Sequence, residues 1–483
     1  MVLGGGIAGL AAATAVAEAG HRVTLVEAGP TLGGTAASIV DPRTGFEVDL
    51  APPVFTVAPD GAAAWLARLG AGERLLDGDL HPLELWLPGH VSRLAAGALP
   101  GSLRLAATLL TCDVLEPVDR ARALVAAMLI RLQMPDPGET HSLYRWLRHA
   151  HQSTRAISRL WNPLCVAACG LPVEEVAAEV GLPALAASLG QGSSGFRLAH
   201  ARVGLERLLN PLVAERLRSR GAQVITGSSA RRLVITGDSV RSVELADGRL
   251  LKADAVVLAV PPSRLAELLP PSWVGQGPFA LAPRARFVAR PSVHLFYDRS
   301  VMAAPVAVAI GEEPVWLVQR RRSGPGADLR AEASAVAGVS LYPAAGGPWS
   351  RLEREESVPR ADALIRAVCP DARDAILVHA LTASQPAAVL LAGPGSTPLR
   401  PGPDTPLSNL WLAGAWTNTG WPGSLEGAYR SGRAAADKVV KNLSTHVAGP
   451  RTADRESASP GNPDPARPVV SDSTPGRRSL LPR

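Results

Sequence analysis

The strongest constraint on the fold is a glycine-rich turn close to the start of the chain. Val2-Leu3 lead into a Gly-x-Gly-x-x-Gly motif at residues 4–9, and an alanine-rich helix is expected to run to about Ala19. In such a turn the glycines permit the tight bend, the approach of a pyrophosphate and close packing of helix on strand. The helix N-terminus adds free amides and partial positive charge. These features predict a set of dinucleotide-binding residues: Gly4, Gly5, Gly6, Ile7, Ala8 and Gly9.

An acidic residue follows the next predicted strand. Residues 22–26 are apolar and β-branched, as in a buried parallel strand, and the strand ends in Glu27, near the position of an acid that binds a ribose hydroxyl. The paired glycines 33–34 come shortly afterwards, where an FAD site continues its pyrophosphate cradle, and they favour FAD over a nicotinamide cofactor. A glycine-rich turn in an unrelated α/β unit is the alternative. The additional predicted cofactor-binding residues are Glu27, Ala28, Gly33, Gly34 and Thr35.

A segment near the other end of the chain is predicted to complete the same site. A strand at 409–414 ends in a small-residue turn, and Ser424 can cap the helix that follows. Small residues recur on one face of that helix from Ala428 to Val440, which would let it lie close against the sheet. Its N-terminal amides would then stabilise negative charge on a reduced flavin. A packing helix without a ligand is the alternative. The residues predicted to bind cofactor here are Gly414, Ala415, Trp421, Ser424 and Leu425, to which we add Ala230, just before a predicted strand.

The chain is long enough for two domains. At 483 residues it exceeds what one core usually serves. We expect the FAD-binding domain to comprise residues 1–60, 200–262 and 405–443, and the substrate domain to comprise 61–199, mainly helical, and 263–404, a mixed sheet. Residues 444–483 are rich in Pro, Ser, Arg and Asp and are predicted to be a disordered tail. The predicted fold is therefore α/β, a two-domain Rossmann-like FAD-binding architecture with an interleaved helical and mixed-sheet substrate domain.

Local signals divide the middle of the chain further. Asn210-Pro211 is predicted to supply the N-cap and first residue of a helix. Turns at Gly237-Asp238 and Asp247-Gly248 predict a three-stranded meander after it. Two helices at 102–110 and 117–132 are unusually apolar, which indicates either a membrane-dipping surface or ordinary helix packing.

Composition excludes several classes of protein. A net charge of +6 with scattered arginines does not support nucleic-acid binding. The four cysteines are too few and too irregular for a disulfide framework or a metal site, so we expect buried thiols. No apolar run reaches about 18 residues, and the chain opens directly on the nucleotide motif, so we expect neither a membrane span nor a signal peptide. The expected location is cytoplasmic or peripheral to the inner face of the plasma membrane.

The motifs resemble one known family. The pattern through Ser38 resembles the flavin amine oxidase and phytoene desaturase superfamily. Residues 410–436 (LWLAGAWTNTGWPGSLEGAYRSGRAAA), with 161–164 and 253–262, resemble the squalene-associated FAD-dependent desaturases, which are hydroxysqualene dehydroxylases. The resemblance covers residues 1–442 and implies reductive dehydroxylation of hydroxysqualene to squalene. It also implies bound FAD, a long apolar isoprenoid substrate and an external reductant such as NAD(P)H.

The chain departs from the family pattern at three places. Thr35 stands where an Arg or Lys commonly follows the paired glycines, and residues 49–53 replace a polar Asn-Gly-Gln-His run. Ala415 stands where the family has an Asp expected to hold a ribityl hydroxyl, a charge-assisted bond worth roughly 1.5–3 kcal/mol. These departures motivate one alternative, a flavin-poor, non-catalytic lipid-binding homologue. A carotenoid or phytoene-type desaturase is the other alternative.

No catalytic residue is assigned from the sequence. Amine oxidation is disfavoured because aromatic residues make up only 4% of the chain, too few for a ring-walled amine cage. His294 and Tyr297 lie on a predicted strand of the substrate domain, and we expect both to be structural.

Overall fold

A parallel sheet at the base of the molecule joins the beginning, middle and end of the chain. The computed structural model describes residues 1–58, 60–76, 83–94, 99, 101–132, 141–189, 198–320 and 336–447. All neighbouring strands of this sheet run parallel, in the order β10-β2-β1-β14-β20. The strands are β1 (Val2–Leu3), β2 (Thr24–Val26), β10 (Gln223–Ile225), β14 (Val256–Leu258) and β20 (Leu410–Leu412).

The order of these strands reverses beside β1. The chain passes from β1 to β2 on one side, whereas β14 and later β20 add on the other side. In open parallel sheets, ligands bind at the carboxyl ends of the strands next to such a reversal. The predicted α/β fold with a Rossmann-like sheet is therefore confirmed, and the boundaries of the predicted domains stay a prediction.

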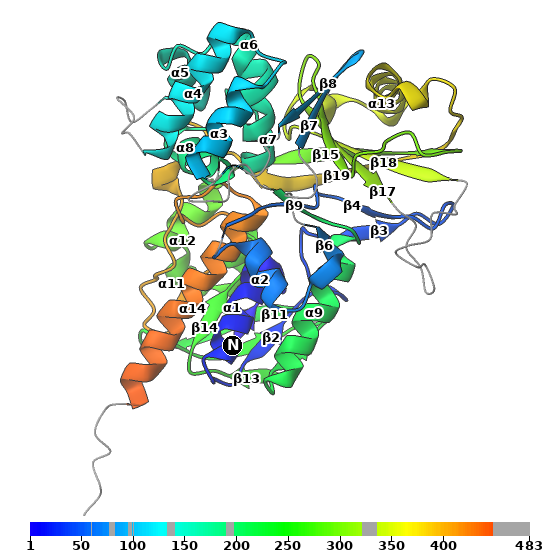
Figure 1. The fold of residues 1–483 in the computed structure, drawn as a ribbon. Helices are drawn as coiled ribbons and strands as arrows, with labels where there is room; N and C mark the ends of the chain where they lie inside the picture. Colours follow the sequence, from blue (N-terminus) through cyan, green and yellow to red (C-terminus); the bar gives the residue numbers. More distant parts are fainter. Residues whose placement is uncertain are drawn as a thin grey trace, which may run out of the picture.

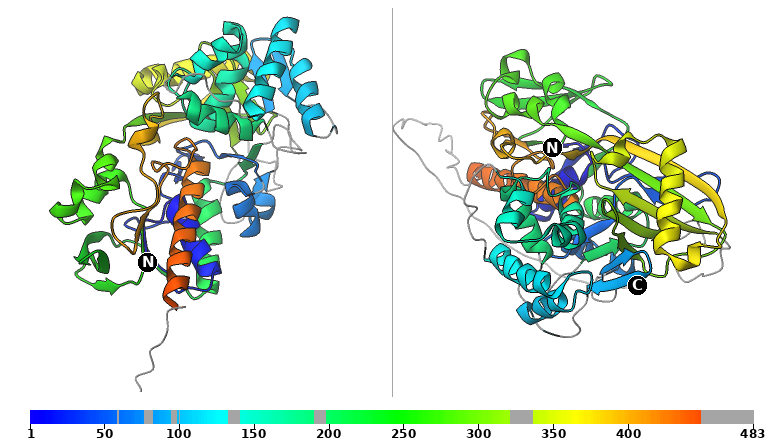
Figure 2. Two further views of the ribbon diagram at one scale, coloured as in Figure 1. Left: turned by 90° about the vertical axis from the view of Figure 1, so that its left-hand side faces the viewer. Right: turned by 90° about the horizontal axis from the view of Figure 1, so that it is seen from above.

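Helix α14 (Leu425–Val447) packs against helix α1 (Ile7–Glu18), as Figures 1 and 2 show. A Cβ atom at Gly432 would overlap the Ala8 carbonyl oxygen and would lie 2.9 Å from Ala11 Cβ. The sequence predicted that the small face of this helix would approach the sheet. The helix does contact β14 and β20 of the sheet, which confirms this prediction, and at Gly432 it also packs closely against α1.

Helix α9 (Leu205–Ser219) begins earlier than predicted. The prediction that Asn210-Pro211 starts the helix is wrong: Gly204 is the N-cap, and Pro211 lies inside. The reason is a set of distant carboxylates on β4 (Glu47–Asp49). The Gly204 amide donates to Glu47 Oε2 at 3.0 Å, and the Leu205 amide donates to Asp49 Oδ1 at 2.7 Å. Since these acids satisfy the first amides, the start of α9 carries no local capping signal.

A seven-stranded mixed sheet lies above the parallel sheet in Figure 1. Only β16 and β7 pair in parallel, and every other pair of neighbours is antiparallel. The hairpin of β7 and β8 falls in a stretch for which the sequence predicted mainly helix. In spatial order the strands are β19 (Leu377–Leu390), β15 (Phe287–Tyr297), β18 (Ala337–Pro343), β17 (Val315–Arg320), β16 (Val306–Ala309), β7 (Leu83–Leu87) and β8 (His90–Leu94).

The two faces of this sheet meet different helices. On β17, Val315 and Leu317 join the buried cluster with α13 (Arg354–Val368), whereas Trp316 and Val318 join the cluster with the helical layer. This alternation is the period of two expected of a strand buried on both faces. The helical layer consists of α3 (Gly101–Leu110), α4 (Pro117–Arg131), α5 (Leu143–His149), α6 (Thr154–Ala156), the π-turn Ile157–Trp161, α7 (Asn162–Cys169) and α8 (Ala178–Ser188).

Smaller elements complete the described chain. The predicted meander is confirmed as β11 (Ala230–Thr236), β12 (Ser239–Leu245) and β13 (Leu250–Lys252). The other strands are β3 (Ser38–Val40), β5 (Val54–Thr56), β6 (Leu75–Leu76) and β9 (Leu198–Ala201), and the other α-helices are α2 (Ala62–Arg68), α10 (Pro262–Leu268), α11 (Pro271–Val274) and α12 (Pro278–Leu281). All four cysteines are buried and free, which confirms the prediction of buried thiols.

Two further predictions concern the C-terminal tail and membrane-spanning segments. The predicted disordered tail lies outside the described residues from 448 onwards, and α14 continues to Val447. Among the residues that the structure describes, no helix has both the length and the apolar character needed to cross a bilayer.

The contact between α1 and α14 predicts a large effect of a side chain at position 432. Gly432→Val would force the two helices apart, so we expect the free energy of unfolding to fall by roughly 1–3 kcal/mol. Chemical denaturation measures this change. Gly402→Val is the control, because Gly402 is exposed and a Cβ added there would meet no atom within 4 Å, and it should stay within about 0.5 kcal/mol of the wild type. Equal stability of the two variants would contradict the packing described.

Candidate functional site

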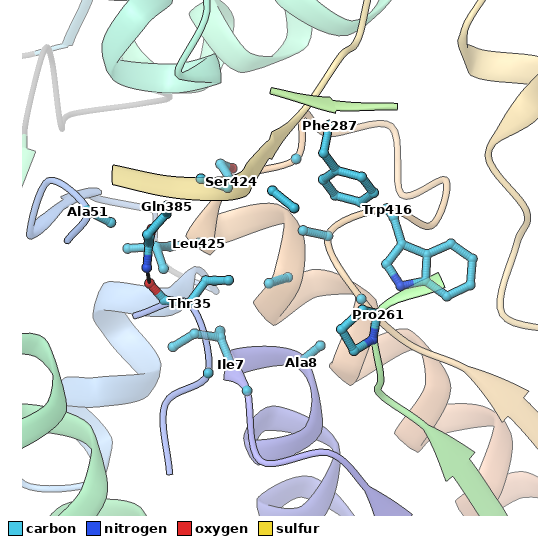
Figure 3. Close-up of a pocket in the computed structure, with 18 of the residues that line it drawn as sticks. Ile7, Ala8, Thr35, Ala51, Pro261, Phe287, Gln385, Trp416, Ser424 and Leu425 are labelled. Carbon is cyan, nitrogen blue, oxygen red and sulfur yellow. Dashed lines mark hydrogen bonds between the residues drawn. The ribbon is translucent and has the colours of Figure 1, made fainter. Parts of the chain in front are cut away.

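A cavity of about 1220 Å³ opens at the carboxyl ends of the parallel strands. Residues just beyond the ends of four of these strands line it: Gly4 follows β1, Glu27 follows β2, Ala259 follows β14, and Gly414 lies two residues beyond β20. Figure 3 shows Ile7 and Ala8 of α1 below the cavity and Ser424 and Leu425 of α14 beside it. The volume exceeds the roughly 300–1,000 Å³ of most small-molecule pockets, so the cavity has space for a large ligand.

The N-terminus of α1 faces the cavity without a side-chain cap. The helix begins at Ile7, no side chain in the described part of the chain bonds its first amides, and its first turn contains no acid. Gly4 has a φ of +105°, and a Cβ there would overlap the Ala259 carbonyl oxygen. A Cβ at Gly9 would overlap the Gly4 carbonyl oxygen in the same way. The turn therefore requires glycine, and its free amides form a site suited to an anion such as phosphate.

Glu27 and the second glycine pair hold this turn in place. The Glu27 carboxylate accepts hydrogen bonds from the amides of Gly5 at 2.5 Å and Gly29 at 2.7 Å. The Gly33 amide donates to the Gly5 carbonyl at 2.8 Å, and a Cβ at Gly34 would lie 2.9 Å from Gly6 Cα. The two glycine turns thus lie against each other and leave backbone, rather than side chains, at the cavity surface.

Helix α14 presents its N-terminus to the same cavity. The Gly427 amide donates to Ser424 Oγ at 3.2 Å, which confirms Ser424 as the N-cap. Gly414, at the end of β20, donates its amide to Ser431 Oγ at 2.9 Å and ties the strand end to the helix. The two segments predicted from opposite ends of the chain therefore meet at one cavity.

Most of the predicted cofactor-binding residues lie in the cavity wall. Gly5, Gly9 and Gly33 lie behind it and support the glycine turns. Trp421 is not in the wall either; the guanidinium carbon of Arg430 lies 4.3 Å from its ring centroid. The predicted residues that do line the cavity are Gly4, Gly6, Ile7, Ala8, Glu27, Ala28, Gly34, Thr35, Ala230, Gly414, Ala415, Ser424 and Leu425.

Sequence reasoning missed Glu426, a buried carboxylate at the cavity. Its Oε2 accepts the Ala62 amide at 2.8 Å and its Oε1 accepts Arg430 Nε at 2.8 Å. Burial raises the pKa of Glu426 despite these bonds. The carboxylate thus caps α2 from the first turn of α14. Because the two residues are 364 positions apart in the chain, no local sequence pattern around Ala62 predicts this cap.

The positions that depart from the family pattern have defined surroundings. The Ala415 carbonyl accepts a hydrogen bond from Arg400 Nη2 at 3.2 Å, and Ala415 lines the cavity. Asp49 is completely buried and does not face the cavity; Arg320 Nη1 donates to it at 2.6 Å, and Ser38 Oγ donates to it at 2.6 Å. Asp49 therefore joins the parallel-sheet half to the seven-stranded sheet.

The wall opposite the glycine turns belongs to the seven-stranded sheet and α7. It is largely apolar, with Phe287 and Trp316 among its members. His294 is fully buried outside this wall, where its ring nitrogens bond Ser340 and Ser292, and burial lowers its pKa to about 3. The described residues contain no group of three or more His, Cys, Asp or Glu side chains that could hold a metal ion.

Tyr297 likewise makes a structural contact away from the cavity. Its hydroxyl donates to Asp362 Oδ1 at 2.8 Å on α13, and its side chain does not line the cavity. The expectation that His294 and Tyr297 are structural agrees with these contacts.

These features define a class of oxidoreductase built on a parallel dinucleotide-binding sheet. The chain matches the profile of the family described as flavin containing amine oxidoreductase over residues 7–440, and it belongs to that family. A flavin is the cofactor of the family, and the uncapped amides of α1 with the glycine cradle fit its phosphate-bearing forms.

Two relatives match the chain over most of its length. The chain is 29% identical to hydroxysqualene dehydroxylase of Rhodopseudomonas palustris, covering 91% of this chain and 97% of the relative. It is 24% identical to 15-cis-phytoene desaturase of Synechococcus elongatus, covering 91% and 95%. Among solved structures, an oxidoreductase from Methanosarcina mazei matches with a TM-score of 0.68 and 16% identity over 90% of this chain and 99% of that one. This last match supports the fold.

Proposed function

We propose that the protein is an FAD-dependent oxidoreductase that replaces the hydroxyl group of hydroxysqualene with hydrogen and so forms squalene. The observation that carries this proposal is the match to hydroxysqualene dehydroxylase over nearly the whole of both chains. A cavity that combines a glycine cradle with a largely apolar opposite wall supports a phosphate-bearing cofactor beside a long apolar substrate.

The chain's own groups suggest how FAD would be held. The first amides of α1 and the backbone of Gly6 and Gly34 would bind the pyrophosphate. Glu27 accepts two amides, and its remaining lone pairs would accept ribose hydroxyls. The N-terminus of α14 at Leu425 would face the flavin ring. When bound and reduced by an external donor such as NAD(P)H, the flavin supplies a hydride.

The opposite wall would protect a reactive substrate from water. Once the hydroxyl oxygen has taken up a proton, its loss as water would leave an allylic carbocation, which bulk water would capture. Apolar side chains such as Phe287 exclude that water. The rings of Trp316 and Tyr342 also line the cavity, and aromatic faces attract positive charge.

Desaturation of a carotenoid-like polyene is the second candidate. The match to phytoene desaturase favours it, and the same cavity would hold either substrate. In that reaction the substrate gives up hydride instead of receiving it. A non-catalytic homologue that binds lipid but little flavin is the third candidate, suggested by Thr35 and Ala415.

Product analysis of purified holoprotein tests the proposed reaction. With hydroxysqualene and a reductant under anaerobic conditions, we expect squalene, identified by gas chromatography and mass spectrometry. With phytoene and an oxidant we expect no new double bonds. Conversion of phytoene alone would favour the desaturase, and a colourless protein that added FAD does not restore would favour the non-catalytic homologue.

Ala415→Asp tests the position of the flavin. If Ala415 faces the cofactor's ribityl chain, the new carboxylate would accept a hydroxyl, and FAD affinity should rise about tenfold or more. Titration of FAD into apoprotein, followed by flavin fluorescence, measures the dissociation constant. Ala387→Asp places a carboxylate at an exposed position of the far wall and should not tighten binding. Equal or weaker binding by Ala415→Asp would place the ribityl chain elsewhere.

Helices α3 and α4 carry an apolar surface suited to a membrane. On α4 and its C-cap, the exposed residues Val118, Val125 and Leu132 recur every seven positions, with exposed fractions of 60%, 59% and 71%. On α3, Leu103 and Leu110 have the same spacing and are 62% and 47% exposed. Seven residues make two helical turns, so each set lies on one face. Because a C30 isoprenoid partitions into bilayers, we propose that this surface docks on the inner face of the plasma membrane.

Vesicle binding tests this docking surface. Val118→Ser/Val125→Ser/Leu132→Ser should weaken binding to phosphatidylcholine–phosphatidylglycerol vesicles at least about tenfold, measured by flotation, because three apolar contacts are lost. The control Leu250→Ser/Ile376→Ser/Val378→Ser changes three similarly exposed residues on other elements and should bind normally. If both triple variants bind like the wild type, the surface does not dock.

A further inference from the structure

Arg290 is a charged residue at the otherwise largely apolar end of the cavity. It lies on β15, lines the cavity, and is packed closely by protein while part of its surface faces the cavity. Burial lowers the pKa of its guanidinium to about 10, so the group remains charged at neutral pH. A charge in this position requires a partner, because leaving a buried ion unpaired costs several kcal/mol by the usual estimate.

The other charged residues of the cavity wall already have partners. Arg264 pairs with Glu267, Glu426 pairs with Arg430, and Glu27 accepts two amides. The side chain of Arg290 makes no hydrogen bond or ion pair with any of the described residues. The electrostatic neighbour that acts on it is the phenol of Tyr342, itself a member of the cavity wall.

Gly170 leaves room for the Arg290 guanidinium, and the end of the helix at this glycine stabilises the positive charge weakly. A Cβ at Gly170 would overlap Arg290 Nη2, so the guanidinium lies against this glycine. Gly170 is the C-cap of α7, with a φ of +74°. The C-terminal end of a helix carries partial negative charge, which favours a cation but does not replace a hydrogen-bond acceptor.

A second polar group without a partner lies opposite Arg290. Gln385 on β19 pairs directly with Arg290 across the antiparallel ladder, so both side chains lie on the same side of the sheet. Its Nε2 donates to the Thr35 carbonyl at 2.9 Å (Figure 3), which fixes the amide orientation. Its Oε1 is buried and has no hydrogen-bond partner within the part of the chain that the structure describes. Two neighbouring side chains on one side of the sheet, both in the cavity wall, therefore carry spare donors at Arg290 and a spare acceptor at Gln385.

This combination indicates the chemical class of group that would bind. A hydroxyl oxygen accepts from a guanidinium while its hydrogen is donated to a carbonyl oxygen, whereas a carboxylate has no hydrogen to offer Gln385. A hydrocarbon would leave both groups unpaired. The geometry assigns to Arg290, with Gln385 beside it, the binding of the hydroxyl group of an isoprenoid alcohol. This inference rests on the proposed function and deepens it, since it explains how an apolar cavity selects the alcohol over a hydrocarbon of the same length.

Ligand binding by oxidised holoprotein tests the assignment without turnover. The probes are hydroxysqualene and squalene in detergent micelles, and quenching of tryptophan fluorescence reports binding because Trp316 and Trp416 line the cavity. Arg290→Met should weaken hydroxysqualene binding about tenfold or more and leave squalene binding unchanged, since only the alcohol loses a hydrogen bond to a charge. Arg290→Lys should recover part of the loss. Arg286→Met, an exposed arginine at the start of the same sheet region, should bind both probes normally.

Two further measurements separate substrate binding from other roles. If Arg290 serves the substrate, Arg290→Met removes an unpaired buried charge, and its melting temperature should equal or exceed that of the wild type. Its FAD affinity and flavin absorption spectrum should also be unchanged. A lower melting temperature with equal loss of both probes would make Arg290 structural, and a changed flavin spectrum or FAD affinity would make it a cofactor contact; either result overturns the assignment.

Ligand binding and product analysis together distinguish failure of the proposed reaction from failure of the Arg290 assignment. Wild-type protein that binds hydroxysqualene through Arg290 but forms no squalene would refute the proposed reaction and leave the hydroxyl site intact. Wild-type protein that forms squalene while Arg290→Met binds both probes normally would refute the hydroxyl site alone. No preference of the wild type for the alcohol would also refute the site.

Discussion

The close contact of α1 with its neighbours is the constraint on which the rest of the structure depends. Glycine at position 9 lets α1 approach the turn at Gly4, and glycine at position 432 lets α14 approach the carbonyl of Ala8. These contacts bring the first and last parts of the described chain to one edge of the parallel sheet. Both helices then present their N-terminal amides to the same cavity, where no side-chain cap blocks α1. A larger side chain at either glycine would separate elements whose proximity creates the site.

Buried polar contacts then join the two halves of the molecule. Asp49 receives the Leu205 amide at the start of α9 and, at the same carboxylate, the guanidinium of Arg320 from the seven-stranded sheet. Tyr342 completes the junction by donating to the Asp49 carbonyl at 2.9 Å while its ring lines the cavity. Groups that would be costly to bury alone are satisfied by each other. The junction therefore fixes the distance between the glycine cradle below and the apolar wall above, which is the space a cofactor and substrate would share.

The distribution of unsatisfied groups gives the cavity its chemical character. Near the glycine turns, free amides favour anionic phosphate, whereas the opposite wall combines apolar surface with the unpaired cation of Arg290 and the unpartnered carbonyl of Gln385. Buried polar groups without partners are rare in folded proteins, and a bound ligand is one way in which such a group is satisfied. The membership in the flavin family and the match to hydroxysqualene dehydroxylase agree with a site divided in this way.

The sequence by itself determined the parts of this protein that rest on local pattern. The glycine spacing predicted the first turn and helix, the Ser424 cap predicted the start of α14, and paired turn residues predicted the meander, because each depends on neighbouring residues. The tertiary structure alone decided where α9 begins, since the carboxylates that satisfy its first amides come from β4, and it decided that the small face of α14 meets α1. It also decided that Glu426 caps α2 and that Arg290 lacks a partner among the described residues. These facts depend on contacts between residues far apart in the chain, and no local periodicity or spacing encodes such contacts.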